Sequence, residues 1–354
     1  MKLAAAAAAS LSLCLAACTG AAPGVLGQAI INGTVDDGDT NVVLVFAQVP
    51  GQSTGSLCTG EVVSPHVVLT AAHCMAPSTV GAGAQFVVFT GTMLPTTGRP
   101  PANELLGVSE SHYVPTFSYD TNSGADQDDV GVLILAQPTM IAPLPFNQYT
   151  LPSSAKGAAA RIIGYGLSDG NDSAGTTAGT RRQAPTTVSE YQAQTLRVFD
   201  GMHANCEGDS GGPTLLTLDG KERIVGITQV GYVGCPVGMS SSDTRIDAYA
   251  SFVDQYVTMF DPPAVAAGGA CSSDGDCGAL ECIGGSCAQP CDPSASASMC
   301  PAGTQCSDVD GRSLCAKPSS QHHGCAIGGH APIGSGVALV LLAALALLAR
   351  SRRA

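Results

Sequence analysis

The sequence is poor in charge, and above all in basic residues. Only 12% of its 354 residues are charged, and 15 Lys and Arg stand against 28 Asp and Glu, a net charge of −13. A chain this acidic is a poor partner for nucleic acid or for an anionic membrane surface. The low charge accompanies 43 glycines and 22 prolines, and this composition favours many short strands and turns over helices. We therefore expect a mainly β protein.

The 15 cysteines indicate an oxidising compartment if the chain is exported. Eight of them lie in residues 271–315: Cys271, Cys277, Cys282, Cys287, Cys291, Cys300, Cys306 and Cys315. Few large apolar side chains occur there, so disulfides must supply most of the stability. The segment lacks paired Cys-x-x-Cys spacings, which argues against a zinc module. We expect a small disulfide-rich module and assign no pairing within it.

The N-terminus has the layout of a secretory signal peptide. Met1-Lys2 precedes an apolar run that extends to Ala17, so residues 1–17 are predicted to be removed on export. Leu15-Ala16-Ala17-Cys18 resembles a bacterial lipobox, which would make Cys18 a lipidated first residue. Ordinary signal cleavage at a nearby small residue is the alternative. Residues 18–29 are then a linker or propeptide.

Residues 30–260 are expected to form the main domain. Short β-rich runs alternate with turns, and the 167–187 segment is expected to be a surface loop with Arg181-Arg182 as a solvated pair. Apolar residues from Ile246 to Phe260 recur at helical spacing, which predicts one C-terminal helix. Asp261-Pro262-Pro263 ends that helix and opens a linker over 261–270.

Residues 316–354 form a tail with an apolar run. The run from Gly336 to Ala349 reaches the roughly 20 residues of a membrane span only when counted from Ala331, and arginines follow it. With the Gly-rich spacer after Cys325, the tail resembles the C-terminal sorting signal of myxobacterial surface proteins. The resemblance implies processing near Cys325 and a hydrophobic anchor. A metal site on the histidines near Cys325 is the less favoured interpretation.

One octapeptide points to chemistry: Cys206-Glu207-Gly208-Asp209-Ser210-Gly211-Gly212-Pro213. A serine hydroxyl needs a base to take its proton and donors to hold the oxyanion that it creates. Flanking glycines allow a strained turn that exposes the serine and aims backbone N–H groups outward. A plain turn of small residues is the alternative, so the chain must also supply a base and a buried carboxylate.

Two earlier segments supply those groups. His73 follows the β-rich run that ends in Leu69-Thr70-Ala71-Ala72, where functional residues often lie. Asp129 precedes the apolar run Val130 to Leu135. A carboxylate carried into the interior there must be hydrogen-bonded or paired, although a solvated Asp at a strand end is the common case. Histidine, aspartate and serine thus occur in the chain order of a chymotrypsin-type triad.

With these three motifs, the chain from Ile30 to about Phe260 resembles a trypsin/chymotrypsin-like (S1 family) serine peptidase. The resemblance implies two six-stranded antiparallel β-barrels with a C-terminal helix. It gives Ser210 as nucleophile, His73 as general base and Asp129 as the group that orients the histidine. The N–H groups of Gly208 and Ser210 would form the oxyanion hole.

The same resemblance implies further roles. The disulfides Cys58–Cys74 and Cys206–Cys235 would brace the histidine and serine loops. Cleavage before Ile30 would release an ammonium that pairs with Asp209. Ala29 precedes that bond, so a trypsin-like activating protease is not expected.

The pocket positions depart from the trypsin pattern. The position at the pocket floor is Ala204 where trypsin-like enzymes carry Asp, Gly231 follows Gln229-Val230, and Ser241 stands where Gly is common. We expect cleavage after small or medium apolar side chains rather than after Lys or Arg. Peptide substrates, an activating protease and a membrane are the expected partners, with no cofactor and no metal. A catalytically inactive binding or adhesion module, or an esterase using the same triad, is the alternative.

Overall fold

The computed structural model describes residues 30–119, 127–218, 220–230, 234–265, 268–272, 274–277, 280–291, 300, 305–309 and 312–316. The predicted signal peptide, the lipobox at Cys18, the sorting tail and the pocket residue Gly231 lie outside these residues. Among the residues described, no helix is both long and apolar enough to cross a membrane.

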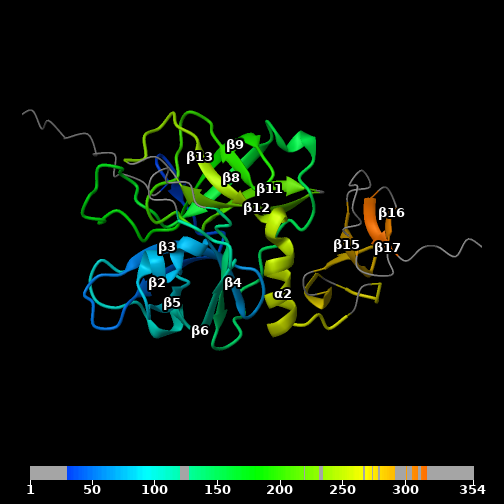
Figure 1. The fold of residues 1–354 in the computed structure, drawn as a ribbon, viewed down its shortest axis with the longest axis horizontal. Helices are drawn as coiled ribbons and strands as arrows, with labels where there is room; N and C mark the ends of the chain where they lie inside the picture. The colour runs from blue at the N-terminus through cyan, green and yellow to red at the C-terminus, as the bar shows by residue number, and fades with distance from the viewer. Residues whose placement is uncertain are drawn as a thin grey trace, which may run out of the picture. The chain divides into compact units, whose positions relative to one another are not determined.

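Six antiparallel strands close the first barrel (Figure 1). In barrel order they are β2 (Val42–Gln48), β3 (Ser56–Val62), β4 (Val67–Thr70), β7 (Gly131–Leu135), β6 (Leu105–Tyr113) and β5 (Gln85–Phe89). β2, β4 and β7 are runs of Val and Leu that are buried along almost their whole length. β-branched side chains fit such a doubly covered strand, because they pack well on a pleated surface. The short helix α1 (Pro77–Val80) follows the histidine loop.

The second barrel repeats this plan. Its strands in barrel order are β8 (Ala159–Gly164), β9 (Arg182–Tyr191), β10 (Thr195–Val198), β13 (Ser241–Arg245), β12 (Lys221–Val230) and β11 (Pro213–Leu218). β8 pairs with both β9 and β11, which closes the sheet, and β1 (Thr34–Val35) extends it beside β9. The two six-stranded antiparallel barrels predicted from the sequence are confirmed.

A C-terminal helix follows the second barrel. A 3₁₀ turn over Ile246–Tyr249 leads into α2 (Ala250–Phe260), so the predicted helix is confirmed with a tighter first turn. The buried stripe of α2, which includes Val253 and Val257, belongs to the same core as the strands of the first barrel. Figure 1 shows the helix beside β4. The helix ends at Phe260, and the N–H of the next residue, Asp261, donates to the carbonyl of Val257; two prolines follow.

The expected loop at 167–187 is partly strand. β9 begins at Arg182 and pairs with β8 from Gly164 to Ala159, so the prediction is wrong for its last residues. Every second residue from Ala184 to Val188 is buried in β9, and one of these, Thr186, is a threonine. That period-2 pattern is typical of a half-covered strand, and the neighbouring Gly and Ser residues obscured it.

The cysteine-rich segment forms its own small sheet. Its strands are β14 (Glu281–Ile283), β15 (Ser286–Pro290), β17 (Arg312–Ala316) and β16 (Gln305–Val309), in that order. Four disulfides join Cys271 to Cys282, Cys277 to Cys287, Cys291 to Cys306 and Cys300 to Cys315. A disulfide-rich region after the helix is therefore confirmed. The sequence could not give these pairings because they depend on which strands become neighbours.

Candidate active site

His73 and Asp129 meet at one end of the first barrel. β4 and β7 are antiparallel neighbours in which Thr70 pairs with Gly131, so the residues just after β4 lie beside those just before β7. The backbone N–H of His73 donates to Asp129 Oδ1 at 2.8 Å, and His73 Nδ1 lies 2.7 Å from Asp129 Oδ2. Asp129 is fully buried, and 17% of the His73 side chain is exposed. With the Nδ1 proton held by the carboxylate, Nε2 is the basic atom of the ring.

The loop that carries Ser210 is attached to the same region through β3. The carbonyl of Ser210 accepts a hydrogen bond at 2.8 Å from the N–H of Thr59. The preceding residue, Cys58, is disulfide-bonded to Cys74, which adjoins His73. The structure thus brings the serine loop, the histidine and the aspartate to one place, although they are far apart in sequence.

Backbone geometry prepares Gly208 to act as a donor. Gly208 has a φ of +95°, and a Cβ at this position would lie 2.8 Å from Gly166 Cα, so only glycine fits without strain. The carbonyl of Glu207, in the peptide group that carries the Gly208 N–H, accepts from Leu167 N–H at 2.7 Å.

The Ser210 N–H is fixed in the same way, because the carbonyl of Asp209 in its peptide group accepts from Gly212 N–H at 2.8 Å. Within the described part of the chain, neither the Gly208 N–H nor the Ser210 N–H has a partner. Both N–H groups therefore remain available to a further hydrogen-bond acceptor.

Asp209 is fully buried beside the serine. Its two carboxylate oxygens accept from the N–H groups of Gly166 and Cys206, both at 2.8 Å. Burial raises the pKa of Asp209 to about 7, against the opposing effect of these bonds and of one from the backbone N–H of Ile30. Ile30 is also fully buried. The structure therefore places Ile30 against Asp209 with its nitrogen still a peptide amide.

The predicted pocket residues Ala204 and Ser241 are both buried. Sequence analysis missed Asn205, whose Nδ2 donates to Thr228 Oγ1 at 3.0 Å and to Ser241 Oγ at 3.2 Å. Its position directly before Cys206 was the available signal. The second disulfide joins Cys206 to Cys235.

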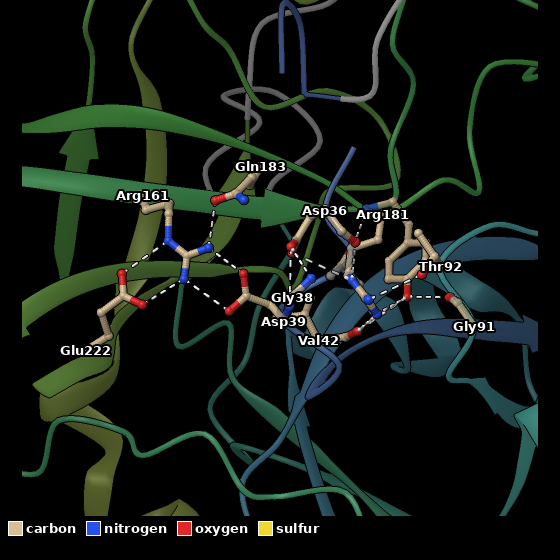
Figure 2. Close-up of polar contacts among 12 residues, drawn as sticks. Asp36, Gly38, Asp39, Val42, Gly91, Thr92, Arg161, Arg181, Gln183 and Glu222 are labelled. Atoms are coloured by element: carbon tan, nitrogen blue, oxygen red, sulfur yellow. Dashed lines mark hydrogen bonds and ion pairs between the residues drawn. The ribbon is translucent and has the colours of Figure 1, made fainter. Parts of the chain in front are cut away.

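Arg181 is buried, and the prediction of a solvated arginine is wrong. Only 1% of it is exposed. Figure 2 shows its guanidinium between three segments: Nε donates to the carbonyl of Asp36, and Nη1 donates to the carbonyl of Val42 and the hydroxyl of Tyr165, each at 3.1 Å. The Asp36 carboxylate lies 3.6 Å from Nε. These acceptors offset the cost of burying the charge and hold the segment after Ile30 beside Tyr165.

A second arginine, Arg161, links the segment after Ile30 to the second barrel (Figure 2). Arg161 on β8 donates to the carboxylates of Asp39 and Glu222 and to the side-chain oxygen of Gln183. Asp39 precedes β2, whereas Glu222 lies on β12. The contacts therefore join the two barrels at the surface.

The arrangement of His73 with Asp129 occurs twice more among the residues that the structure describes. The backbone N–H of His66 and its Nδ1 contact the two oxygens of Asp261 at 2.7 and 2.6 Å. His203 contacts Asp200 in the same manner at 2.8 and 2.5 Å. A histidine held by an aspartate at two points is therefore not by itself a catalytic feature. The position beside Ser210 distinguishes the His73 pair.

Two antiparallel six-stranded barrels, with a histidine–aspartate pair beside the turn of a half-buried serine, define the class of chymotrypsin-fold serine peptidases. The trypsin family model matches residues 31–253. The chain is 29% identical to chymotrypsin-like elastase family member 1 of Bos taurus over 231 residues, which cover 58% of this chain and 81% of the relative. The Macaca fascicularis protein of the same name is 28% identical over 232 residues, with the same coverage. The chain belongs to the trypsin family and is a serine peptidase.

Proposed function

We propose that this chain is an exported, surface-anchored serine endopeptidase that works through His73, Asp129 and Ser210. The observation that carries the proposal is the two-point contact of Asp129 with His73 beside the loop of Ser210. Asp129 holds the imidazole in the tautomer whose Nε2 accepts a proton, and it stabilises the imidazolium that forms.

In the proposed reaction, Ser210 Oγ attacks the scissile carbonyl as its proton passes to His73 Nε2. The negative charge that develops on the carbonyl oxygen is held by the N–H groups of Gly208 and Ser210. Collapse of this intermediate breaks the C–N bond, and His73 gives its proton to the leaving amine. Water, deprotonated by the same histidine, then hydrolyses the acyl-enzyme and restores Ser210.

Activation is proposed to occur by cleavage between Ala29 and Ile30. The new ammonium of Ile30 would pair with the buried carboxylate of Asp209. The support is that Ile30 already lies against this carboxylate, whose pKa is raised to about 7, and that no cation among the described residues faces it. Cleavage would lower that pKa by adding a positive charge.

The proposal that the protein is exported and anchored rests on sequence features together with the disulfides. Six disulfides occur among the described residues, and such bonds persist in oxidising compartments. We propose that residues 1–17 direct export and that lipid on Cys18, the C-terminal tail or both attach the protein to the cell surface. N-terminal sequencing of the mature protein distinguishes a start at Ile30 from a start at Cys18.

We propose a P1 preference for small or medium apolar side chains, because Ala204 supplies no negative charge at the pocket floor. Two relatives that match this chain are named chymotrypsin-like elastases. Peptide substrates that differ only in P1 test this preference. Higher kcat/KM for Ala, Val or Leu than for Arg is expected, and an Arg preference contradicts it.

A fluorophosphonate probe tests the triad directly, because it labels only an activated serine. We expect the cleaved protein to be labelled and the Ser210→Ala variant to be unlabelled. Ser189→Ala, which alters a serine on β9, is the matched control and should label like the parent. Absence of labelling of the parent would support the inactive binding module instead.

A further inference from the structure

Thr59 contacts the serine loop with almost every group that it has. It lies on β3 of the first barrel and is fully buried. Its N–H donates to the carbonyl of Ser210 at 2.8 Å, and its hydroxyl donates to the carbonyl of Gly208 at 2.9 Å. The same hydroxyl accepts from the N–H of Tyr165 at 3.0 Å.

The methyl group of Thr59 also reaches this loop. A Cβ built on Gly212 would lie 3.1 Å from Thr59 Cγ2, and one built on Gly211 would lie 2.4 Å from the Thr59 carbonyl oxygen. The carbonyl accepts from Thr70 Oγ1 at 2.7 Å. Thr59 is therefore held by its own barrel on one side while it supports the serine loop on the other.

These contacts complete the fixation of four consecutive carbonyl groups. Those of Glu207 and Asp209 are held by the N–H groups of Leu167 and Gly212, whereas those of Gly208 and Ser210 are both held by Thr59. Glycine at position 208 has no side chain to restrict its backbone, so its peptide group with Asp209 is held by two hydrogen bonds: Asp209 N–H donates to the carbonyl of Cys206 at 2.9 Å, and the Gly208 carbonyl accepts from Thr59. The Gly208–Asp209 peptide group lies between the two peptide groups that carry the oxyanion donors. Turning the Gly208 carbonyl would therefore reorient both of those groups.

We propose that Thr59 is a positioning residue for the oxyanion hole. Its hydroxyl, placed between the N–H of Tyr165 and the carbonyl of Gly208, locks the loop so that the N–H groups of Gly208 and Ser210 converge. This inference rests on the proposed function, since it assigns a role in stabilising the oxyanion of acyl transfer. Thr59 does not touch the reacting atoms.

The test compares Thr59→Val, which keeps the shape but removes the hydroxyl, with Thr59→Ser, which keeps the hydroxyl. Thr186→Val, at another buried threonine on β9, is the control. For Thr59→Val we expect kcat for a peptide substrate to fall about 10- to 100-fold with KM little changed, because donors displaced by a fraction of an ångström lose transition-state stabilisation. Thr59→Ser and Thr186→Val should stay within about threefold of the parent.

A peptide boronate gives a second readout, because its adduct with Ser210 places an oxygen in the oxyanion hole. Its affinity should fall in Thr59→Val in parallel with kcat and be restored in Thr59→Ser. The proposal is overturned if boronate affinity and kcat fall equally in Thr59→Ser and Thr59→Val. It is also overturned if kcat of Thr59→Val stays within twofold of the parent. If Thr59→Val does not fold, comparing Thr59→Ala with Thr59→Ser tests the hydroxyl in the same way.

Amide hydrogen exchange separates this proposal from the proposed function. Exchange in residues 206–212 should accelerate in Thr59→Val but not in Thr186→Val, whether or not the parent is catalytically active. Unchanged exchange in that segment overturns the role of Thr59. Accelerated exchange together with an unreactive Ser210 in the parent would support the role of Thr59 in the loop and contradict only the peptidase function.

Discussion

Asp129 binds His73 at two points, through the backbone N–H at 2.8 Å and through Nδ1 at 2.7 Å. The pairing fixes both where the imidazole lies and which of its nitrogens is protonated. Since Asp129 is fully buried, solvent does not compete for this carboxylate. His66 is held in the same manner by Asp261, and this second pair offers an internal control.

Asp129→Asn should abolish most activity with little change in fold. The Asn amide can keep both contacts with His73. It donates an N–H to Nδ1 where the carboxylate accepted one, so it favours the tautomer whose Nε2 carries the proton and cannot act as a base. We expect kcat to fall about 10⁴-fold, the scale of this substitution in the general serine-peptidase template. The measurement is kcat at saturating peptide substrate. The Asp261→Asn variant alters an equivalent pair away from Ser210 and should keep kcat within about threefold; equal losses in both would contradict the role of Asp129.

Ser241→Gly should widen the proposed pocket. Ser241 is buried on β13 and accepts a hydrogen bond from Asn205. Removing its side chain makes room for about one methylene group, which is worth roughly 10- to 100-fold in discrimination. The ratio of kcat/KM for P1 Leu over P1 Ala should rise accordingly. Ser242→Gly, whose side chain lies on the opposite face of the strand, should leave the ratio unchanged; a similar rise there would argue against the pocket.

Arg181→Met should strongly destabilise the fold. It removes the guanidinium that contacts Asp36, Val42 and Tyr165 and leaves a buried carboxylate without its cation. Removing one partner of a buried pair costs about 3–5 kcal/mol. Urea unfolding on a Ser210→Ala background, which prevents autolysis, measures the change. Arg182→Met, at the half-buried neighbour, should cost less than about 1 kcal/mol, and equal costs would show that the contacts of Arg181 contribute little.

Glu61→Gln should stabilise the protein at high pH but not at low pH. Glu61 on β3 is fully buried, and within the described residues neither carboxylate oxygen has a hydrogen-bond partner. Burial, and then the charge of Asp243, raise the pKa of Glu61 well above its usual 4.5. The folded state therefore keeps this proton after the unfolded chain has lost it, and stability falls as pH rises above about 4.5.

The Tm advantage of Glu61→Gln over the parent should accordingly grow by several degrees between pH 4 and pH 8. Both proteins carry Ser210→Ala. Glu222→Gln, at a partly exposed carboxylate paired with Arg161, is the control and should show no such growth. An advantage of the same size at both pH values would contradict the role of Glu61 ionisation.

Local sequence signals predicted several of the strands and the helix, whereas the two barrels followed from the family resemblance. A run of Val and Leu such as Val67 to Leu69 is typical of a strand that is covered on both faces. The spacing of Val253 and Val257 predicts the packed face of α2. β9 was harder, because its burial alternates and its threonines resemble loop residues. Whether such a segment pairs depends on the neighbouring strand, which sequence patterns do not contain.

The sequence by itself determined which residues are proposed to do the chemistry. Ser210 stands between Asp209 and Gly211 in a glycine-rich turn, His73 follows a strand and Asp129 precedes one, and each needs a backbone conformation or environment that neighbouring residues provide. Tertiary structure decided the rest. The burial of Arg181 and the contacts of Thr59 with the serine loop join segments far apart in the chain, and a polar side chain gives no local signal of whether its partner will be water or protein.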